Sequence, residues 1–575
     1  MDVSRRSLLA IGGAGLIGAA IPTTYSQLTN SAPLEWLVGD HGGEYGPEKD
    51  ISDAFNRTIQ AKGDVPGRVI VPYVNGVLYV DKSSLIIPDN IEIDFCNNVI
   101  KLQDHASKYL LTNLKNNNDI SGKVVIKNAI FDGNKRGGQT RRFDRVAKDD
   151  TYGDIYDYKY NYPGFCLVFD RIEELVVENI KIIDAEGWGI AHFLCDNVRF
   201  SNIEITSQNG IGLNGDGITG VGTRYVHIQN IQGYTNDDMI GISTSRATVQ
   251  GISVFNPSQG RNVENVTIEN LRSVKNDQSW SFVGVGLYFS DDKIIKNIDI
   301  NGVFGVYHQN ILRIGNYWSA TASCGIDNIT LENIHSSTLA PASADISLFS
   351  GQINTLSVTK SQITRLMADS ANYFNMENAV VSVEGAKIST LIISGFEYHS
   401  DFLSVDPSDT NAIVVCKNNG EIENITFDIR IVADKTNGYT LLNKADTSTV
   451  VTKLNIASFL PNNEVVTFHN ITNAKKYAIG ARFNVKVSEP LSGESIITRT
   501  GSDAWIDGVF DLTDGISHVP LWCAPTQPKI TSCYDADAPN NRYVARIDTN
   551  GLFMILQKPR NVKKIYLDGA GWKCA

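Results

Sequence analysis

One short pattern recurs along the middle of this chain: an apolar, often β-branched run, then asparagine, then a second apolar run. It occurs as VVIKNAIF at 124–131, LVVENIKII at 175–183, VRFSNIEI at 198–205, VHIQNIQG at 226–233, VTIENLRS at 266–273, IIKNIDI at 294–300 and ITLENIHS at 329–336. The shared asparagines are Asn128, Asn179, Asn202, Asn230, Asn270, Asn297 and Asn333. The shorter gaps between them fit single coils of a solenoid, and the longer ones fit inserted loops or a skipped repeat.

Each run has the length and alternation of a short strand, and one coil cannot bury its own apolar face. Stacked coils would pair their strands in parallel, with asparagine at the bend between two strands. This pattern predicts an all-β chain built on a single-stranded right-handed parallel β-helix over 91–475. A short N-terminal cap over 31–90 should contain a helix within 48–62, starting at Asp50 or Ser52. The Gly-, Asp- and Asn-rich turns after 475 predict a C-terminal antiparallel β-sandwich over 476–575, of lectin-like or trimerisation type.

Residues 1–30 form a separate N-terminal segment. Ser4-Arg5-Arg6-Ser7-Leu8-Leu9 is similar to a twin-arginine export signal, and the apolar run that follows is too short to span a membrane. Export is one interpretation of this segment. The other is a peptide that anchors the chain in a larger particle.

The formal net charge of −12 argues against nucleic acid as a partner, since a phosphate backbone needs a basic surface. An acidic polysaccharide remains compatible, because a few local arginines can bind it. The eight cysteines show no zinc or redox spacing, and a Cys523–Cys533 disulfide stays open. Nucleotide-binding and protease motifs are lacking, so no cofactor and no metal site are expected.

Three aspartates stand out from the many acidic turn residues. Asp216 lies in Asn-Gly-Asp-Gly, and Asp237 and Asp238 lie in Asn-Asp-Asp-Met, about one coil later. Asp216 should therefore lie beside the pair on the next coil. Three carboxyls so close cannot all ionise freely, and at least one pKa should rise. A glycosidase needs such a set, with one acid and one base. The alternative is that all three are turn residues.

Residues 188–242 resemble the polygalacturonase family of glycoside hydrolases, a β-helix family, and the likeness covers roughly 175–335. NGDGITGVGTRYVHIQNIQGYTNDDMIGI follows that family's Asn-Thr-Asp and Asp-Asp motifs in order and spacing. Gly284-Val285-Gly286 falls where the family carries Gly-His-Gly, and Arg313-Ile314-Gly315 where it carries Arg-Ile-Lys.

The resemblance implies a role for each matching residue. Asp237 corresponds to the general acid, and Asp216 and Asp238 to the pair that activates water, which implies inversion. Arg313 corresponds to the arginine that binds a sugar carboxylate. Trp188, His192 and Tyr288 are further candidates for substrate binding. Val285 and Gly315 depart from the family's histidine and lysine, which argues against galacturonan.

The overall layout also resembles the tail-spike depolymerases of bacteriophages. That resemblance implies a homotrimer in the virion tail that cleaves bacterial capsular polysaccharide and contacts other tail proteins through its N-terminus. Three alternatives stay open: a secreted pectinase-like hydrolase, a polysaccharide lyase in which the three aspartates bind Ca²⁺, and a non-catalytic glycan-binding spike. Acids elsewhere would serve if the site lay between subunits, namely Asp184, Glu186, Asp291 and Asp292.

Overall fold

The structure is a computed structural model. It describes residues 34–106, 108–113, 121–137, 165–206, 215–244, 260–274, 281–289, 293–315, 325–340, 344–367, 378–400, 411–433, 440–444, 450–456, 465–469, 476–479, 486–490, 496–500, 503–511, 517–518, 525–535, 542–549, 552–556 and 564–573. Residues 1–33 lie outside these ranges, so both interpretations of the N-terminal segment stay predictions. Among the described residues, no helix is long and apolar enough to cross a membrane.

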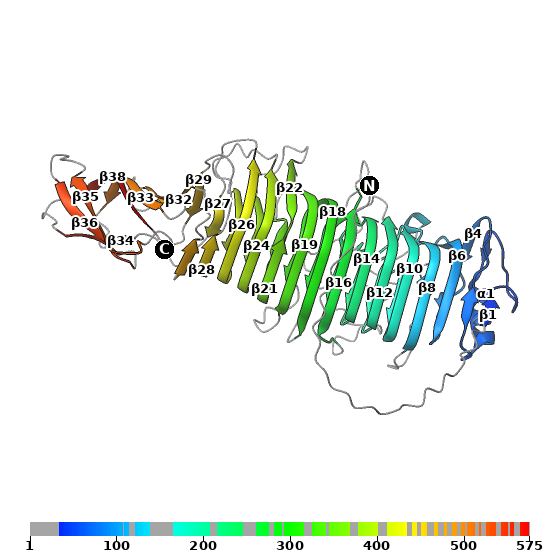
Figure 1. Cartoon of the computed structure of the whole chain (residues 1–575). Helices are drawn as coiled ribbons and strands as arrows, with labels where there is room; N and C mark the ends of the chain where they lie inside the picture. The colour runs from blue at the N-terminus through cyan, green and yellow to red at the C-terminus, as the bar shows by residue number, and fades with distance from the viewer. Residues whose placement is uncertain are drawn as a thin grey trace, which may run out of the picture.

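The chain is an elongated parallel β-helix, as the repeat predicts (Figure 1). One ladder is made mainly of long strands that bend in the middle. They are β6 (Ile91–Leu102), β8 (Ser121–Asp132), β10 (Ile172–Ile183), β12 (Asp196–Thr206), β14 (Arg224–Tyr234), β16 (Val263–Ser273), β18 (Ile294–Gly315), β19 (Gly325–Ala340), β21 (Gly351–Thr359), β22 (Gln362–Met367), β24 (Ala386–Ser400), β26 (Glu421–Ala433), β28 (Val450–Ile456) and β30 (Lys476–Ile479).

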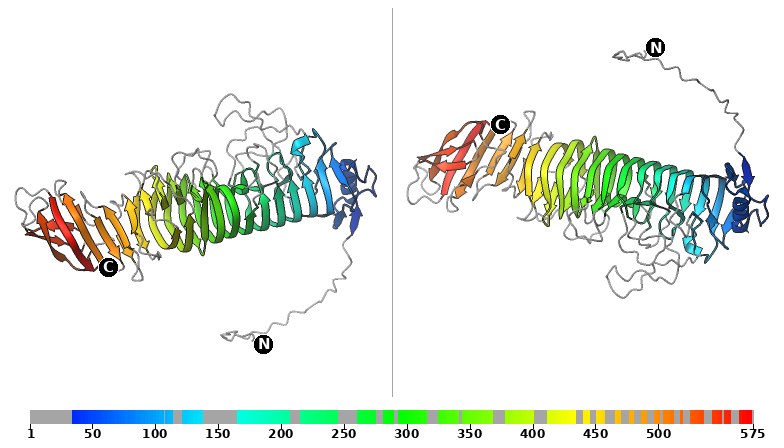
Figure 2. Two further views of the ribbon diagram at one scale, coloured as in Figure 1. Left: turned by 90° about the horizontal axis from the view of Figure 1, so that it is seen from above. Right: turned by 90° about the horizontal axis from the view of Figure 1, so that it is seen from below.

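A second parallel ladder, here called the short-strand sheet, closes each coil. Its strands are β5 (Leu85–Ile86), β7 (Leu111–Thr112), β9 (Leu167–Asp170), β11 (Ile190–Phe193), β13 (Ile218–Val221), β15 (Asp238–Ser243), β17 (Ser281–Tyr288), β20 (Ile346–Leu348), β23 (Asn378–Glu384), β25 (Asn411–Lys417), β27 (Thr440–Lys444), β29 (Val465–His469) and β31 (Lys486–Pro490). The end of β18 also belongs to it, between β17 and β20. The two further views in Figure 2 show the coils stacked along one axis.

The core is a set of apolar columns that run through the coils. In one column, each residue pairs in register with the next and is at most 1% exposed: Ile93, Ile126, Val177, Phe200, Ile228, Ile268, Ile300, Leu331, Val358, Ile393 and Phe427. Burying each such side chain stabilises the fold by about 1.5–3 kcal/mol. The repeat therefore supplies the core coil by coil.

The asparagines form a ladder at the bend, here called the Asn ladder. Each side-chain amide donates to the asparagine of the preceding coil, at 2.9–3.4 Å: Asn179 to Asn128, Asn202 to Asn179, Asn230 to Asn202, and Asn270 to Asn230. Their φ angles are 54–55°, a left-handed conformation that asparagine tolerates better than most residues. The long gaps at 128–179 and 230–270 are therefore single coils with insertions.

Asn297 was predicted on this ladder, and that prediction is wrong. Its amide donates to Asn265 at 3.0 Å and accepts from Asn328 at 3.3 Å, so it belongs to a second ladder at the other end of the same strands. Gly302 takes the place after Asn270, because Leu271 pairs with Val303. An asparagine between apolar residues occurs both at the start of these strands and at their bend. The sequence pattern therefore could not tell which of the two ladders contains Asn297.

The N-terminal end is capped by α1 (Ser52–Lys62), within the predicted range. The other elements of this end are β1 (Glu35–Leu37), β2 (Lys49–Asp50), β3 (Arg68–Ile70) and β4 (Val77–Val80). Asp50 accepts a hydrogen bond from the Ser52 backbone N–H at 3.0 Å. Phe55 is fully buried and stacks on Phe95, with ring centroids 6.3 Å apart. The helix thus closes the open end of the apolar core.

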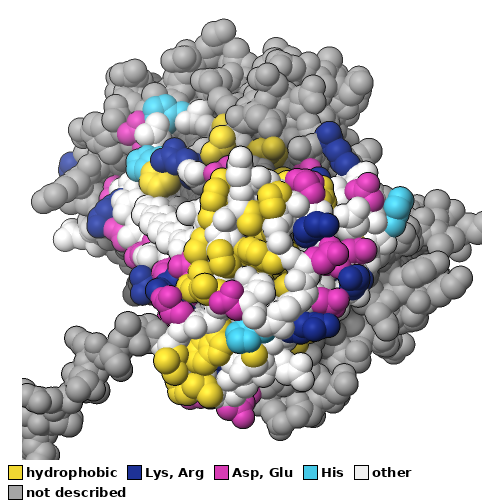
Figure 3. Space-filling view, turned by 90° about the vertical axis from the view of Figure 1, so that its right-hand side faces the viewer, with side chains coloured by type: hydrophobic (Ala, Val, Ile, Leu, Met, Phe, Trp, Pro, Cys, Tyr) yellow, Lys and Arg dark blue, Asp and Glu magenta, His cyan; other side chains and the backbone are white. Residues whose placement is uncertain are grey.

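Figure 3 views this end along the axis and shows hydrophobic side chains gathered on it. Several large apolar residues of the cap are exposed by 37–66%: Leu34, Leu37, Val65, Tyr73 and Ile86. The sequence pattern did not predict these residues as surface residues.

Parallel pairing extends beyond the range 91–475 at both ends. It already joins β1 to β3 and β2 to β4, and it continues through β30 and β31, which ends at Pro490. Antiparallel pairing begins between β31 and β32. It joins β32 (Ile496–Thr500), β33 (Asp503–Asp511), β38 (Lys564–Lys573), β35 (Lys529–Asp535), β36 (Arg542–Ile547), β37 (Leu552–Ile555) and β34 (Ser517–His518). Cys533 has a free thiol, so the Cys523–Cys533 disulfide is not formed.

Candidate active site

Asp216, Asp237 and Asp238 lie where the chain enters strands of the short-strand sheet. Ile218 of β13 pairs with Ile240 of β15, so Asp216 and Asp238, each two residues earlier, occupy the same position on neighbouring coils. The backbone N–H of Gly217 donates to the carbonyl of Asp238 at 2.8 Å, which continues the pairing to this point. The predicted juxtaposition is present, and Asp237 immediately precedes Asp238.

The three carboxyls differ in burial. Asp216 is 8% exposed and Asp238 only 3%, whereas Asp237 is half-buried. Burial raises the pKa of Asp238 well above its usual value, and the charges of Asp237 and Asp216 raise it further. A hydrogen bond from Tyr288 and the charge of Arg313 oppose this rise without cancelling it. Asp238 therefore holds a proton at pH values where an ordinary aspartate has lost it.

Hydroxyl groups bind both stacked carboxyls. Thr219 Oγ1 donates to Asp216 Oδ2 at 2.7 Å, and the Tyr288 hydroxyl donates to Asp238 Oδ2 at 2.7 Å. Thr219 was not predicted as a site residue. The signal that could have found it is its place next to Ile218, whose side chain is in the core, because the neighbouring residue of a strand then points outward.

Two glycines provide space beneath these carboxyls. Thr219, Gly241, Gly286 and Arg313 pair in register on four successive coils. A Cβ at Gly286 would lie 2.3 Å from Asp238 Oδ2, and one at Gly241 would lie 3.4 Å from Asp216 Oδ2. Each carboxyl thus leans over the glycine of the next coil, and a larger residue at 286 would displace Asp238.

The two departures from the polygalacturonase motifs have different structural reasons. Val285 is 1% exposed and packs in the core, so its side chain faces away from Asp238. Gly315 lies beneath Phe349, since a Cβ there would come within 2.3 Å of that ring. The Arg313 guanidinium carbon lies 5.7 Å from the centre of the same ring, and Arg313 is half-buried. An aromatic ring therefore occupies the region beside Arg313 where the motif has lysine.

Trp188 and His192 were predicted to contact substrate, and the structure corrects this. Trp188 is 1% exposed and stacks on Phe165, with ring centroids 4.4 Å apart. It lies on the coil before Asp216, and the backbone N–H of the following residue, Gly189, donates to the Asp216 carbonyl at 2.9 Å. His192 is fully buried in an interior column and contacts the edge of Phe200. Burial lowers the pKa of His192 to about 3, so this residue is neutral. Neither side chain reaches the molecular surface.

A metal site is not evident in the ranges that the structure describes. No three acidic, histidine or cysteine side chains there are arranged to hold a metal ion. Of the acids proposed for a site between subunits, Asp184 is buried and Glu186 half-buried, while Asp291 and Asp292 lie outside the described residues.

A shallow groove of about 440 Å³ lies elsewhere, along the Asn ladder. Asn179, Asn202 and Asn230 line it, together with Lys181 and Glu204, whose charges pair at 2.8 Å. It contains neither Asp216 nor Asp238. The groove follows the bend of the long strands and is separate from the stacked aspartates.

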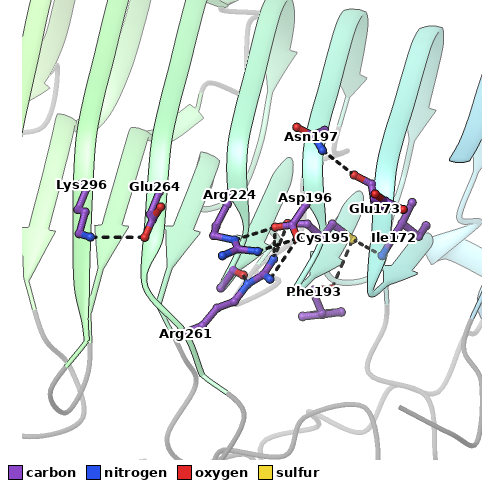
Figure 4. Close-up of polar contacts among 11 residues, drawn as sticks. Ile172, Glu173, Phe193, Cys195, Asp196, Asn197, Arg224, Arg261, Glu264 and Lys296 are labelled. Carbon is purple, nitrogen blue, oxygen red and sulfur yellow. Dashed lines mark hydrogen bonds and ion pairs between the residues drawn. The ribbon is translucent and has the colours of Figure 1, made fainter. Parts of the chain in front are cut away.

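A second charged cluster lies in the turns that follow the short strands (Figure 4). Arg224 donates to both oxygens of Asp196 at 2.9 Å, and Arg261 donates to Asp196 Oδ1 at 2.6 Å. Burial raises the pKa of Asp196, but the bonds and charges of the two arginines outweigh it and lower the pKa. Arg261 also donates to the carbonyls of Cys195 and Gly222. This cluster ties neighbouring coils together and was not predicted from the sequence.

Solved structures of known proteins resemble this chain, but at low sequence identity. No family model and no curated protein sequence matches the chain. A family 28 exopolygalacturonase of Yersinia enterocolitica is 13% identical, with 78% of each chain covered and a TM-score of 0.42. A tailspike protein mutant of E. coli bacteriophage HK620 is 11% identical, with 96% of this chain and 95% of that chain covered and a TM-score of 0.47.

A protein whose structure is described as that of an adhesin aligns to a similar extent. The surface adhesin PfbA of Streptococcus pneumoniae is 12% identical, with 92% of this chain and all of that chain covered (100%), and a TM-score of 0.40. Since hydrolase, tailspike and adhesin align about equally, these likenesses do not choose between functions.

Proposed function

We propose that this protein is a glycoside hydrolase that cleaves a polysaccharide at Asp216, Asp237 and Asp238. The observation that carries the proposal is the stacking of Asp216 and Asp238 in register on neighbouring coils, with the pKa of Asp238 raised well above its usual value. Turn residues on a solvated surface have no need of this arrangement. A pair of carboxyls that differ in protonation is what glycosidic cleavage requires.

The roles follow from burial. Asp237 is half-exposed and donates its proton to the leaving glycosidic oxygen as the bond to the anomeric carbon breaks. A water molecule attacks that carbon from the opposite face and gives its proton to Asp216 or Asp238. Asp237 and Asp238 together hold one proton, which the buried Asp238 binds when the site is empty. When this proton passes to Asp237 and then to the leaving oxygen, the ionised Asp238 can take a proton from the attacking water, which restores the starting state. The product has inverted configuration.

The substrate that we propose is an acidic polysaccharide of a bacterial surface, such as a capsule. Arg313 lies beside the aspartates and can pair with a sugar carboxylate. Phe349 covers Gly315, and Val285 faces the core, so the two side chains that a pectinase would present are replaced. A substrate other than galacturonan fits this surface better.

We also propose a setting for the activity. An elongated β-helix with a small capped end and a C-terminal antiparallel unit suits a homotrimeric spike in a phage virion tail, anchored to other tail proteins by its N-terminal segment. Secretion as a free hydrolase is the alternative. Light scattering of the full chain distinguishes a trimer from a monomer.

The decisive experiment incubates the protein with a panel of purified capsular polysaccharides and measures new reducing ends. We expect Asp237→Asn to lower the rate by about 10²–10⁴-fold, the usual contribution of a general acid. Asp299→Asn is the matched control, since Asp299 is exposed on the bent ladder. Full activity of Asp237→Asn would overturn the assignment of this residue.

The same assay tests the two other functions. Tyr288 and Arg313 lie beside the aspartates and are residue types that serve as base in lyases, so a lyase is the second candidate. An unsaturated product that absorbs in the ultraviolet, lost on adding chelator, would favour a calcium-dependent lyase. Binding to capsule with no new ends of either kind would identify a non-catalytic spike.

A further inference from the structure

Tyr288 reaches Asp238 along an unusual path. Val285 and Leu287 of β17 are buried in the core, so the outward-facing positions of this strand are those of Gly286 and Tyr288. Tyr288 pairs in register with Ser243, at the far end of β15 from Asp238. Its ring therefore lies back along the strand, over Gly286, to bring the hydroxyl to Asp238 Oδ2 at 2.7 Å.

Gly286 makes this path possible. A Cβ at this position would lie 2.3 Å from Asp238 Oδ2, 2.5 Å from the Tyr288 hydroxyl and 2.6 Å from Tyr288 Cε2. Both partners of the hydrogen bond thus occupy the space that any larger residue would fill. The absence of a side chain at residue 286 and the phenol of Tyr288 are therefore both needed for this hydrogen bond.

We propose that Tyr288 is a positioning residue for the reaction: its hydroxyl, packed over Gly286, fixes the orientation of the Asp238 carboxyl and holds its Oδ2. The inference deepens the proposed hydrolase function and rests on it. Among the described residues, Asp238 Oδ1 is buried and has no hydrogen-bond partner. Tyr288 thus binds one oxygen and leaves the buried Oδ1 to carry the proton.

Four groups set the charge of Asp238. Asp237 and Asp216 favour its neutral form, as burial does, while Tyr288 and Arg313 favour the ionised form. Removing the Tyr288 hydroxyl takes away a group that favours ionisation. The Asp238 pKa should therefore rise further, and the fraction of enzyme with Asp238 ready to act as a base should fall at a given pH.

Tyr288→Phe tests this with little change in shape. We expect kcat to fall by about tenfold or more, the effect of losing a hydrogen bond to a charged group, with KM changed by less than about twofold. The acid limb of the pH–rate profile should move to higher pH. Tyr73→Phe in the exposed cap is the matched control, and its kcat and pH profile should not change.

A substitution at Gly286 tests whether the space beneath Tyr288 is needed for the hydrogen bond. Gly286→Ala should displace the contact and lower kcat, but in the Tyr288→Phe background it should cost much less than alone, because the contact is already lost. Independent, multiplicative effects of the two substitutions on kcat would contradict the claim that Gly286 and Tyr288 act through the same hydrogen bond.

A readout without activity keeps this inference separate from the hydrolase proposal. In protein labelled with ¹³C at aspartate Cγ, the Asp238 resonance is assigned by its loss in Asp238→Asn, and its titration is followed in the Tyr288→Phe variant. A rise of the Asp238 pKa supports the inference even if no polysaccharide is cleaved. An unchanged titration together with an unshifted pH–rate profile overturns it, even if Asp237→Asn proves the hydrolase.

Discussion

The Asn ladder and the stacked aspartates are both columns of short polar side chains that the coil repeat brings into register. In the ladder, each amide donates to the oxygen of the preceding coil, as Asn202 does to Asn179 and Asn230 does to Asn202. An amide carries both donor and acceptor, so a column of asparagines is self-complementary. Most of its members are exposed, yet the column is continuous over five asparagines, from Asn128 to Asn270.

The aspartate column has the same geometry and the opposite electrostatics. Two ionised carboxylates have no donor between them, so Asp216 and Asp238 in that state cannot satisfy each other as two amides do. Each instead takes a donor from outside the column, Thr219 in one case and Tyr288 in the other. The remaining repulsion and the burial raise the pKa of Asp238. One solenoid repeat can therefore build either a self-paired ladder or a column whose members repel each other, depending on whether the stacked group can pair with itself.

Asp238→Asn replaces a carboxyl of the aspartate column with the amide found in the Asn ladder. We expect it to have the largest effect, which is on activity. An amide at 238 cannot exchange the proton that the proposed reaction requires, so we expect activity to fall by about 10²–10⁴-fold, measured as new reducing ends. Asp299→Asn again serves as the control. Retention of more than a tenth of the activity would mean that the buried carboxyl of this column has no catalytic role.

Asn202→Ala breaks the ladder at its centre. The variant loses hydrogen bonds to Asn179 and Asn230 and forces alanine into φ 55°, so we expect a loss of about 2 kcal/mol in the free energy of unfolding, measured by chemical denaturation. Asn202→Gly removes the backbone strain but not the lost bonds, so it should cost less. Equal losses in both variants would show that the amides, not the backbone, are what the ladder contributes.

Much of the fold could be predicted because the repeat is written in consecutive residues. The apolar columns follow from alternation within each run, and the ladder follows from asparagine at the bend. Asn297 was placed wrongly because Asn265 and Asn297 begin their strands with the same residue types that surround the bend. The C-terminal pairing gave no such period, so its boundary could not be located from the pattern.

The sequence predicted only the part of the site that depends on spacing along the chain. The spacing of Asp216 and Asp238 is about one coil, which places them side by side. The direction of a side chain in a four-residue strand is set by its neighbours across the sheet, so sequence alone could not place His192 inside. The contact of Tyr288 with Asp238 depends on the register of β15 with β17, and the long chain segment between these strands hides that register.

The pH dependence of stability should distinguish the two columns. The folded-state pKa of Asp238 lies above its unfolded value, so the folded protein binds this proton more tightly. That contribution to stability is fully present below the unfolded pKa and is lost as pH rises through the folded pKa. Asp238→Asn cannot lose a proton, so its melting temperature should exceed that of the wild type at pH 8, by less at pH 5. An identical difference at both pH values would show that Asp238 does not titrate in this range.

Asn202→Asp makes the reverse exchange and should have the smallest effect. The new carboxylate still accepts from Asn230 but no longer donates to Asn179, which costs about 1 kcal/mol at pH 7. Residue 202 is exposed, so solvent screens the added charge and its pKa should stay near the ordinary aspartate value of about 3.9. Below that value the protonated acid can donate again, and the loss should shrink, as chemical denaturation at pH 3 and pH 7 would reveal. A loss that grows toward low pH would contradict the self-complementarity argument, because it would mean that the ladder tolerates a charge better than a restored donor.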